Sequence, residues 1–151
     1  MKRSILLFLT LLLSACVAQP TLVPSATTST PLVLRSEENS YTPQAGDLDK
    51  QQAGVILTSL DLLERTDLDP VRTELSILGS MPNVCNELRV KVNPPDDSYN
   101  VFIEIYSLID PKENCDNVFQ QFKAQITLGI YSQGRYSLWV NKIYIGDFTS
   151  Y

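Results

Sequence analysis

The chain has no histidine and only three cysteines among its 151 residues. Without histidine, it lacks the commonest general base and the commonest transition-metal ligand. A Ser-His-Asp or Cys-His catalytic arrangement is therefore excluded. A pair of carboxylates acting on a glycosidic bond is the enzymatic alternative that remains. The sequence favours a protein that is not an enzyme and needs no metal or cofactor.

The chain also has no glycine-rich phosphate loop and no basic run. Its formal net charge is −5, and this becomes −7 if the leader that carries Lys2 and Arg3 is removed. An acidic chain of this kind is a poor partner for nucleic acid and for anionic lipid head groups. We therefore expect no nucleic-acid partner.

The first sixteen residues have the order of a secretory signal peptide. Lys2 and Arg3 precede an apolar run from Ile5 to Leu13, and small residues lead to Cys16. The run is shorter than the ~20 residues of a membrane-spanning helix. Leu13-Ser14-Ala15-Cys16 resembles the lipobox of bacterial lipoproteins, which signal peptidase II cleaves. The resemblance implies removal of residues 1–15, lipid (diacylglyceryl and a fatty acid such as palmitate) on Cys16, and a place on the extracytoplasmic face of the cell membrane.

Residues 16–46 are predicted to be a flexible linker. They are rich in Thr, Ser and Pro, as in Pro24-Ser25-Ala26-Thr27-Thr28, and show no sustained hydrophobic period. Leu32-Val33-Leu34 is the single apolar island in this segment. Residues 47–151 are predicted to form the folded domain.

If Cys16 carries lipid, Cys85 and Cys115 remain as an even pair in an oxidising compartment. We expect a disulfide near one end of the domain, which stabilises the fold by roughly 3–4 kcal/mol. Two free thiols or a redox pair are the alternatives.

Apolar and polar residues alternate through most of the domain, which predicts strands. Residues 55–64 could form a strand or a helix, and we favour a strand. Gly79-Ser80-Met81 is expected to end the strand that begins at Val71. Further strands are expected at residues 88–92, 101–106, 122–128, 134–140 and 143–148. About seven short strands joined by turn-rich loops predict an all-β sandwich.

The last two strands are expected to form a hairpin with a type I′ turn at Asn141-Lys142. In this register Val140 faces Ile143, Trp139 faces Tyr144, and Leu138 faces Ile145. The core face would then include Ile143 and Ile145 together with Tyr136, Leu138 and Val140.

Gly134-x-Tyr136-x-Leu138 resembles the tyrosine corner of immunoglobulin-like and fibronectin-like domains. The resemblance implies an antiparallel sandwich, with Leu138 where antibody domains have a cysteine. With its lipobox and linker, the whole chain is similar to uncharacterised bacterial surface lipoproteins.

The candidate binding patch is Trp139 and Tyr144, extended by Tyr106 and Phe102 if their strand lies beside the hairpin. The alternative is a cross-strand pair that only shields the sheet. Asp67-Leu68-Asp69 and Asp96-Asp97 could bind calcium, but loop carboxylates more often form turns. We expect a surface binding or structural module whose partner is an envelope protein or a glycan. The other hypothesis is a protease inhibitor that presents the loop Asn93-Pro94-Pro95-Asp96-Asp97.

Overall fold

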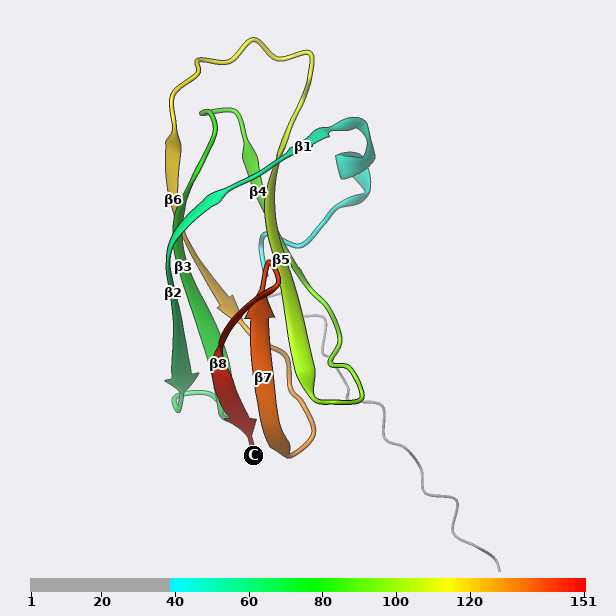
Figure 1. The fold of residues 1–151 in the computed structure, drawn as a ribbon, viewed down its shortest axis with the longest axis vertical. Coiled ribbons are helices and arrows are strands. Elements are labelled where there is room, and N and C mark those ends of the chain that lie inside the picture. Colours follow the sequence, from blue (N-terminus) through cyan, green and yellow to red (C-terminus); the bar gives the residue numbers. More distant parts are fainter. Residues whose placement is uncertain (1–38) are drawn as a thin grey trace, which may run out of the picture.

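A computed structural model describes residues 39–151, which form two packed β-sheets (Figure 1). The five-stranded sheet has the order β1-β5-β7-β8, with β4 on the other edge of β5, and the three-stranded sheet has the order β2-β3-β6. The elements are a short 3-10 helix η1 (Ala45–Asp49), β1 (Gln51–Ala53), β2 (Ile56–Arg65), β3 (Arg72–Met81), β4 (Glu87–Val92), β5 (Asn100–Ile109), β6 (Gln120–Thr127), β7 (Gly134–Val140) and β8 (Ile143–Ser150).

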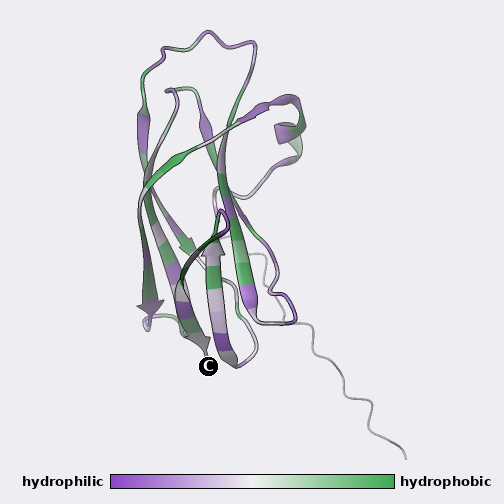
Figure 2. Ribbon diagram, viewed as in Figure 1, coloured by the Kyte–Doolittle hydropathy of each residue, from purple (hydrophilic) through white to green (hydrophobic). Residues whose placement is uncertain are grey.

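The core lies between the two sheets and is built from every second residue of the strands. Leu75 and Ile77 of β3 are fully buried, as are Val101 of β5 and Leu138 of β7. Apolar residues recur along these strands in Figure 2. The predicted all-β sandwich is confirmed, and residues 56–65 form a strand rather than a helix.

One strand pair departs from the expected antiparallel pattern. Residues 100–103 of β5 pair with residues 137–140 of β7 in parallel. Between these two strands the chain passes through β6 in the opposite sheet, so it re-enters the first sheet in the direction of β5. The expectation of antiparallel pairing throughout is therefore wrong at this pair.

The predicted end at Gly79 of the strand that begins at Val71 is also wrong, because β3 continues to Met81. A Cβ atom at Gly79 would lie 2.5 Å from the backbone oxygen of Ile56 and 2.8 Å from Cζ of Phe122. Glycine stands inside this strand because two neighbours approach its backbone closely. It does not mark a turn.

The C-terminal hairpin follows the prediction as far as Trp139. Asn141 and Lys142 have φ angles of 46° and 71°, as a type I′ turn requires. Val140 pairs with Ile143 and Trp139 with Tyr144, but Leu138 pairs with Gly146 because a bulge intervenes. The predicted pairing of Leu138 with Ile145 is therefore wrong.

The predicted core face of this hairpin is only partly correct. Ile143 beside the turn is 66% exposed, which contradicts its place in the core. Ile145 is half-buried and packs against the core. Tyr136 is fully buried, and its hydroxyl donates a hydrogen bond to the carbonyl of Ser132 at 2.9 Å. This bond to the backbone a few residues upstream is the geometry of a tyrosine corner.

Asn39 and Tyr41, which the sequence assigns to the linker, contact the edge of β4 that faces away from β5. The N–H of Val90 donates to the carbonyl of Tyr41 at 2.8 Å, and the Asn39 amide donates to the carbonyl of Val90 at 3.0 Å. The Tyr41 ring packs against the core. The leader, Cys16 and most of the linker lie outside the described residues. Within residues 39–151, no helix has the length and apolar character needed to cross a membrane.

Candidate binding surface

Three aromatic side chains lie in a row on the outer face of the five-stranded sheet. We call Phe102 of β5, Trp139 of β7 and Tyr144 of β8 the aromatic row. Phe102 is paired with Trp139 across the parallel strands, and Trp139 with Tyr144 across the hairpin. The ring centroids of Phe102 and Trp139 are 6.3 Å apart, and those of Trp139 and Tyr144 are 5.4 Å apart. The predicted pair is confirmed, and Phe102 extends it.

The aromatic row is open to solvent at both ends. Phe102 is 38% exposed and Tyr144 is 49% exposed, while Trp139 between them is half-buried. The indole N–H of Trp139 donates to Oδ1 of Asn100 at 3.3 Å, which helps to fix the ring orientation. Exposed aromatic rings held in fixed positions are suited to contact a partner at low cost in conformational entropy.

A charged and polar cluster borders Tyr144. The carboxylate of Asp147 accepts hydrogen bonds from Oγ of Ser137 at 2.8 Å and from Nη2 of Arg135 at 2.6 Å. The hydrogen bond from Ser137 lowers the pKa of Asp147, and those from Arg135 and Tyr144 lower it further. The same carboxylate raises the pKa of Tyr144. The cluster therefore presents a charged aspartate and a neutral phenol beside the aromatic row.

Tyr106 is not part of the aromatic row. It lies on the same face of β5, but it is opposite Arg89 of β4, and Glu104 stands between it and Phe102. Among the described residues it makes no ring contact of the kind that joins the other three. Tyr106 instead lines an adjacent groove.

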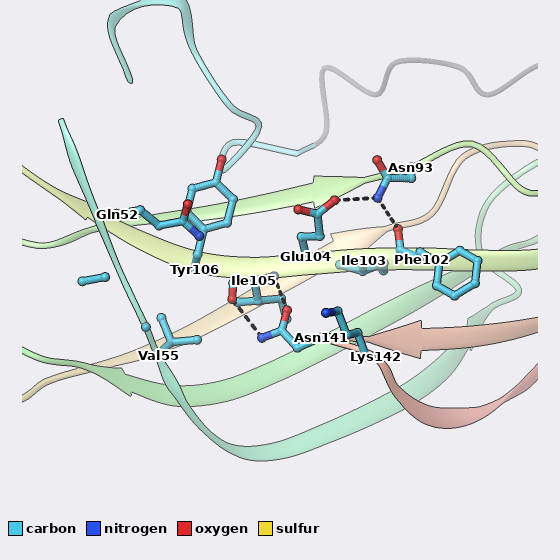
Figure 3. Close-up of a pocket in the computed structure, with 12 residues that line it drawn as sticks. Gln52, Val55, Asn93, Phe102, Ile103, Glu104, Ile105, Tyr106, Asn141 and Lys142 are labelled. Carbon is cyan, nitrogen blue, oxygen red and sulfur yellow. Dashed lines mark hydrogen bonds between the residues drawn. The ribbon is translucent and has the colours of Figure 1, made fainter. Parts of the chain in front are cut away.

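This groove, about 950 Å³ in volume, lies over the segment of β5 between β1 and β7. Tyr106 and Gln52 lie toward one end, and Phe102 and Lys142 toward the other (Figure 3). Phe102 therefore belongs to both the groove and the aromatic row. The sequence did not predict the groove, because it depends on where β1 and β7 end along β5.

The side chain of Asn141 is hydrogen-bonded to the backbone of β5 at the groove. Its Oδ1 accepts from the N–H of Ile105 at 2.8 Å, and its Nδ2 donates to the carbonyl of the same residue at 2.9 Å. On the opposite side of β5, Glu104 accepts from Nζ of Lys91 and from Nδ2 of Asn93, both at 3.0 Å. These contacts with Asn93 and Lys91 lower the pKa of Glu104.

Comparison with known families identifies the domain. The family model of the ORF11 beta-sandwich domain matches residues 75–150. The chain belongs to the ORF11 beta-sandwich domain family. The matched segment runs from β3 to the end of β8, and so contains all three residues of the aromatic row. The searches found no match among the curated proteins or the solved structures.

The disulfide of this ORF11 beta-sandwich domain joins Cys85 to Cys115, as the sequence predicts. It links the β3–β4 connection to the β5–β6 connection at one end of the sandwich (Figure 1). Glu113 lies close to both sulfur atoms. Because the two sulfurs are bonded to each other, they are not available as thiolate ligands for a metal.

One aspartate in each of the two acidic loops is engaged by contacts within the domain. Both oxygens of Asp67 accept from the guanidinium of Arg65, at 2.8 and 2.7 Å, and this lowers the pKa of Asp67 to about 2. In the other loop, Oδ1 of Asp96 accepts from the backbone N–H groups of Ser98 and Asn100. The contacts of Asp96 with the backbone are typical of a carboxylate that forms a turn, and Asp67 is held in an ion pair.

Proposed function

We propose that this member of the ORF11 beta-sandwich domain family is a non-catalytic binding module, held outside the membrane by lipid on Cys16. The observation that carries the proposal is the aromatic row, in which three rings share an exposed sheet face. Tyrosine and tryptophan are enriched among the residues that dominate binding energy at protein interfaces. The Cys85–Cys115 disulfide supports a place in an oxidising compartment.

Substitution of the aromatic row tests the binding role. In the full-length chain, Trp139→Ser with Tyr144→Ser should abolish capture of an envelope component and leave the thermal unfolding midpoint nearly unchanged. Tyr151→Ser is the matched control, because Tyr151 is an exposed tyrosine outside the row. If the double variant loses its fold as well as its partner, the rings serve the stability of the sheet.

The proposed lipid anchor on Cys16 can be tested separately. Cells that express the chain and are fed a labelled fatty acid should incorporate the label into the native protein but not into Cys16→Ala. The native chain should fractionate with membranes after removal of residues 1–15. An unlabelled chain that keeps its leader would contradict the proposed anchor.

A protease inhibitor is the second candidate, and two backbone hydrogen bonds favour it. The loop that contains Pro94 and Pro95 is closed by Asp96, whose N–H donates to the carbonyl of Asn100 at 3.0 Å and whose carbonyl accepts from Tyr99 at 3.0 Å. A loop held in this way resists the motion that cleavage requires. A panel of serine, cysteine and metalloproteases decides between the candidates, since rapid cleavage of this loop without inhibition excludes the inhibitor.

A further inference from the structure

We infer that the groove beside the aromatic row binds a neutral, linear saccharide, and this inference rests on the proposed binding function. The occupant would lie along β5 from Tyr106 to Phe102 and continue onto the aromatic row. These two positions are four residues apart on one strand, a separation of about 13 Å. The groove volume, about 950 Å³, is in the range of sites that hold a ligand larger than a single sugar.

The backbone of the groove does not favour a peptide added as a strand. Such a peptide needs free N–H and carbonyl groups on an exposed sheet edge. Both backbone groups of Ile105 are bonded to the side chain of Asn141, and the carbonyl of Ile103 accepts from the Asn141 N–H at 2.9 Å. Recognition along this part of β5 must therefore come from side chains.

The side chains that remain combine ring faces with hydrogen-bonding groups. Phe102 and Tyr106 offer aromatic faces, onto which the C–H face of a sugar ring can pack. Gln52 offers an amide, and Lys142 an ammonium group that forms no ion pair among the described residues. An amide and an ammonium group can bind sugar hydroxyls. A few polar groups among apolar walls are typical of ligand sites.

The charges of the groove favour a neutral ligand over a polyanion. Its carboxylate, Glu104, is paired with Lys91, which leaves Lys142 as the one unpaired charge among the lining residues. The formal net charge of the chain is −5, or −7 without the leader, and either charge repels polyanions at long range. A protein partner with an apolar surface is also disfavoured, because it would leave the groove's polar side chains without hydrogen-bond partners.

The single tryptophan of the chain makes the site directly observable. Trp139 is the only tryptophan in the sequence, so its intrinsic fluorescence reports on the aromatic row alone. Full-length protein in detergent is titrated with four neutral hexasaccharides, namely cellohexaose, xylohexaose, maltohexaose and chitohexaose, and with acidic oligogalacturonate. We expect a saturable fluorescence change with at least one neutral probe, and binding at least tenfold weaker for the acidic probe.

Two variants test whether the saccharide binds in the groove. Phe102→Ala and Gln52→Ala should each weaken binding of the active probe, by about tenfold for the aromatic residue. Phe119→Ala is the control, because Phe119 is an exposed phenylalanine in the β5–β6 connection. Unfolding midpoints near that of the native protein show that a loss is local. Gln52 is exposed on β1, so Gln52→Ala can still test the groove if Phe102→Ala fails to fold.

The outcomes separate this inference from the function on which it rests. If none of the neutral probes binds, or if the acidic probe binds best, the saccharide inference is overturned. Loss of envelope capture in the Trp139 and Tyr144 variant would then still support a binding module with a different partner. If probe binding is saturable but unaffected by Phe102→Ala and Gln52→Ala, the sugar binds elsewhere and the groove is wrongly assigned.

Discussion

The side chain of Asn141 satisfies both backbone groups of Ile105, a residue 36 positions earlier in the chain. Asn141 is the first residue of the turn between β7 and β8, and Ile105 lies in the stretch of β5 where β7 has ended and β1 has not begun. The amide has the same donor and acceptor pair as a peptide group. It therefore replaces the missing strand neighbour at this position.

Substitutions of Asn141 should separate its two roles. Asn141→Gly keeps the positive φ of the turn but removes the amide, so we expect a loss of about 1–2 kcal/mol in unfolding free energy. Asn141→Ala adds the cost of a left-handed backbone at a residue with a Cβ atom, about 1 kcal/mol more. Urea unfolding, monitored by the fluorescence of Trp139, measures the unfolding free energy of both variants. A glycine variant as stable as the native protein would show that the amide contributes no net stability.

Gly79 should not tolerate even a methyl group. The Cβ atom of Gly79→Ala would lie 2.5 Å from the backbone oxygen of Ile56, so the β2 backbone has to move. We expect a loss of about 1–3 kcal/mol, the usual cost of overpacking. Gly54→Ala is the matched control, because its Cβ atom would meet nothing within 4 Å. Thermal unfolding compares the two, and an equal effect at both sites would contradict the steric explanation.

The structure also shows which features local sequence could predict. Alternation of apolar and polar residues predicted the strands and the sandwich, because burial of one sheet face leaves a period of two along each strand. The pairing of Trp139 with Tyr144 followed from the turn at Asn141-Lys142, since a two-residue turn sets the register beside it. Beyond the bulge between Leu138 and Trp139 the two strands stay paired, but in a register shifted from the predicted one.

Features that depend on distant residues were not predictable in this way. Phe102 joins the aromatic row only because β5 lies parallel to β7, and no local pattern encodes which strands become neighbours. The groove likewise needs β1 and β7 to end at separate points along β5. Tyr41 was assigned to the linker because it lies in a polar, proline-containing stretch, and its contacts with Val90 of β4 and with the core come from distant parts of the chain.

Removal of the disulfide should lower stability without changing the fold. Cys85 and Cys115 are separated by 30 residues, and closing a loop of that length in the unfolded chain is worth about 3–4 kcal/mol. The double variant Cys85→Ser with Cys115→Ser should therefore unfold at lower denaturant concentration while its far-ultraviolet circular dichroism is retained.

Reductant provides the control for this prediction. It should destabilise the native protein to the level of the double variant, and leave the double variant itself unaffected. If reductant changes the unfolding of the double variant, its effect comes from another source than the Cys85–Cys115 bond.

The ion pair between Asp47 and Arg89 should make the domain sensitive to acid. The Asp47 carboxylate accepts from Nε and Nη2 of Arg89 at 2.8 and 2.7 Å, and both side chains are largely buried. The hydrogen bond from Arg89 lowers the pKa of Asp47 below its ordinary value of 3.8. A carboxyl group with a lowered pKa stabilises the fold above its unfolded pKa. This contribution is lost as the pH falls through the folded pKa.

Asp47→Asn tests this link between η1 and β4. At neutral pH the variant should lose about 2 kcal/mol, because Arg89 loses a charged hydrogen-bond partner. Below about pH 4 the difference from the native protein should shrink, since the native carboxyl group is then becoming protonated as well. Asp116→Asn, at an exposed position in the β5–β6 connection, should stay within about 0.5 kcal/mol of the native protein. A difference for Asp47→Asn that stays constant down to pH 2 would show that its contribution does not depend on charge.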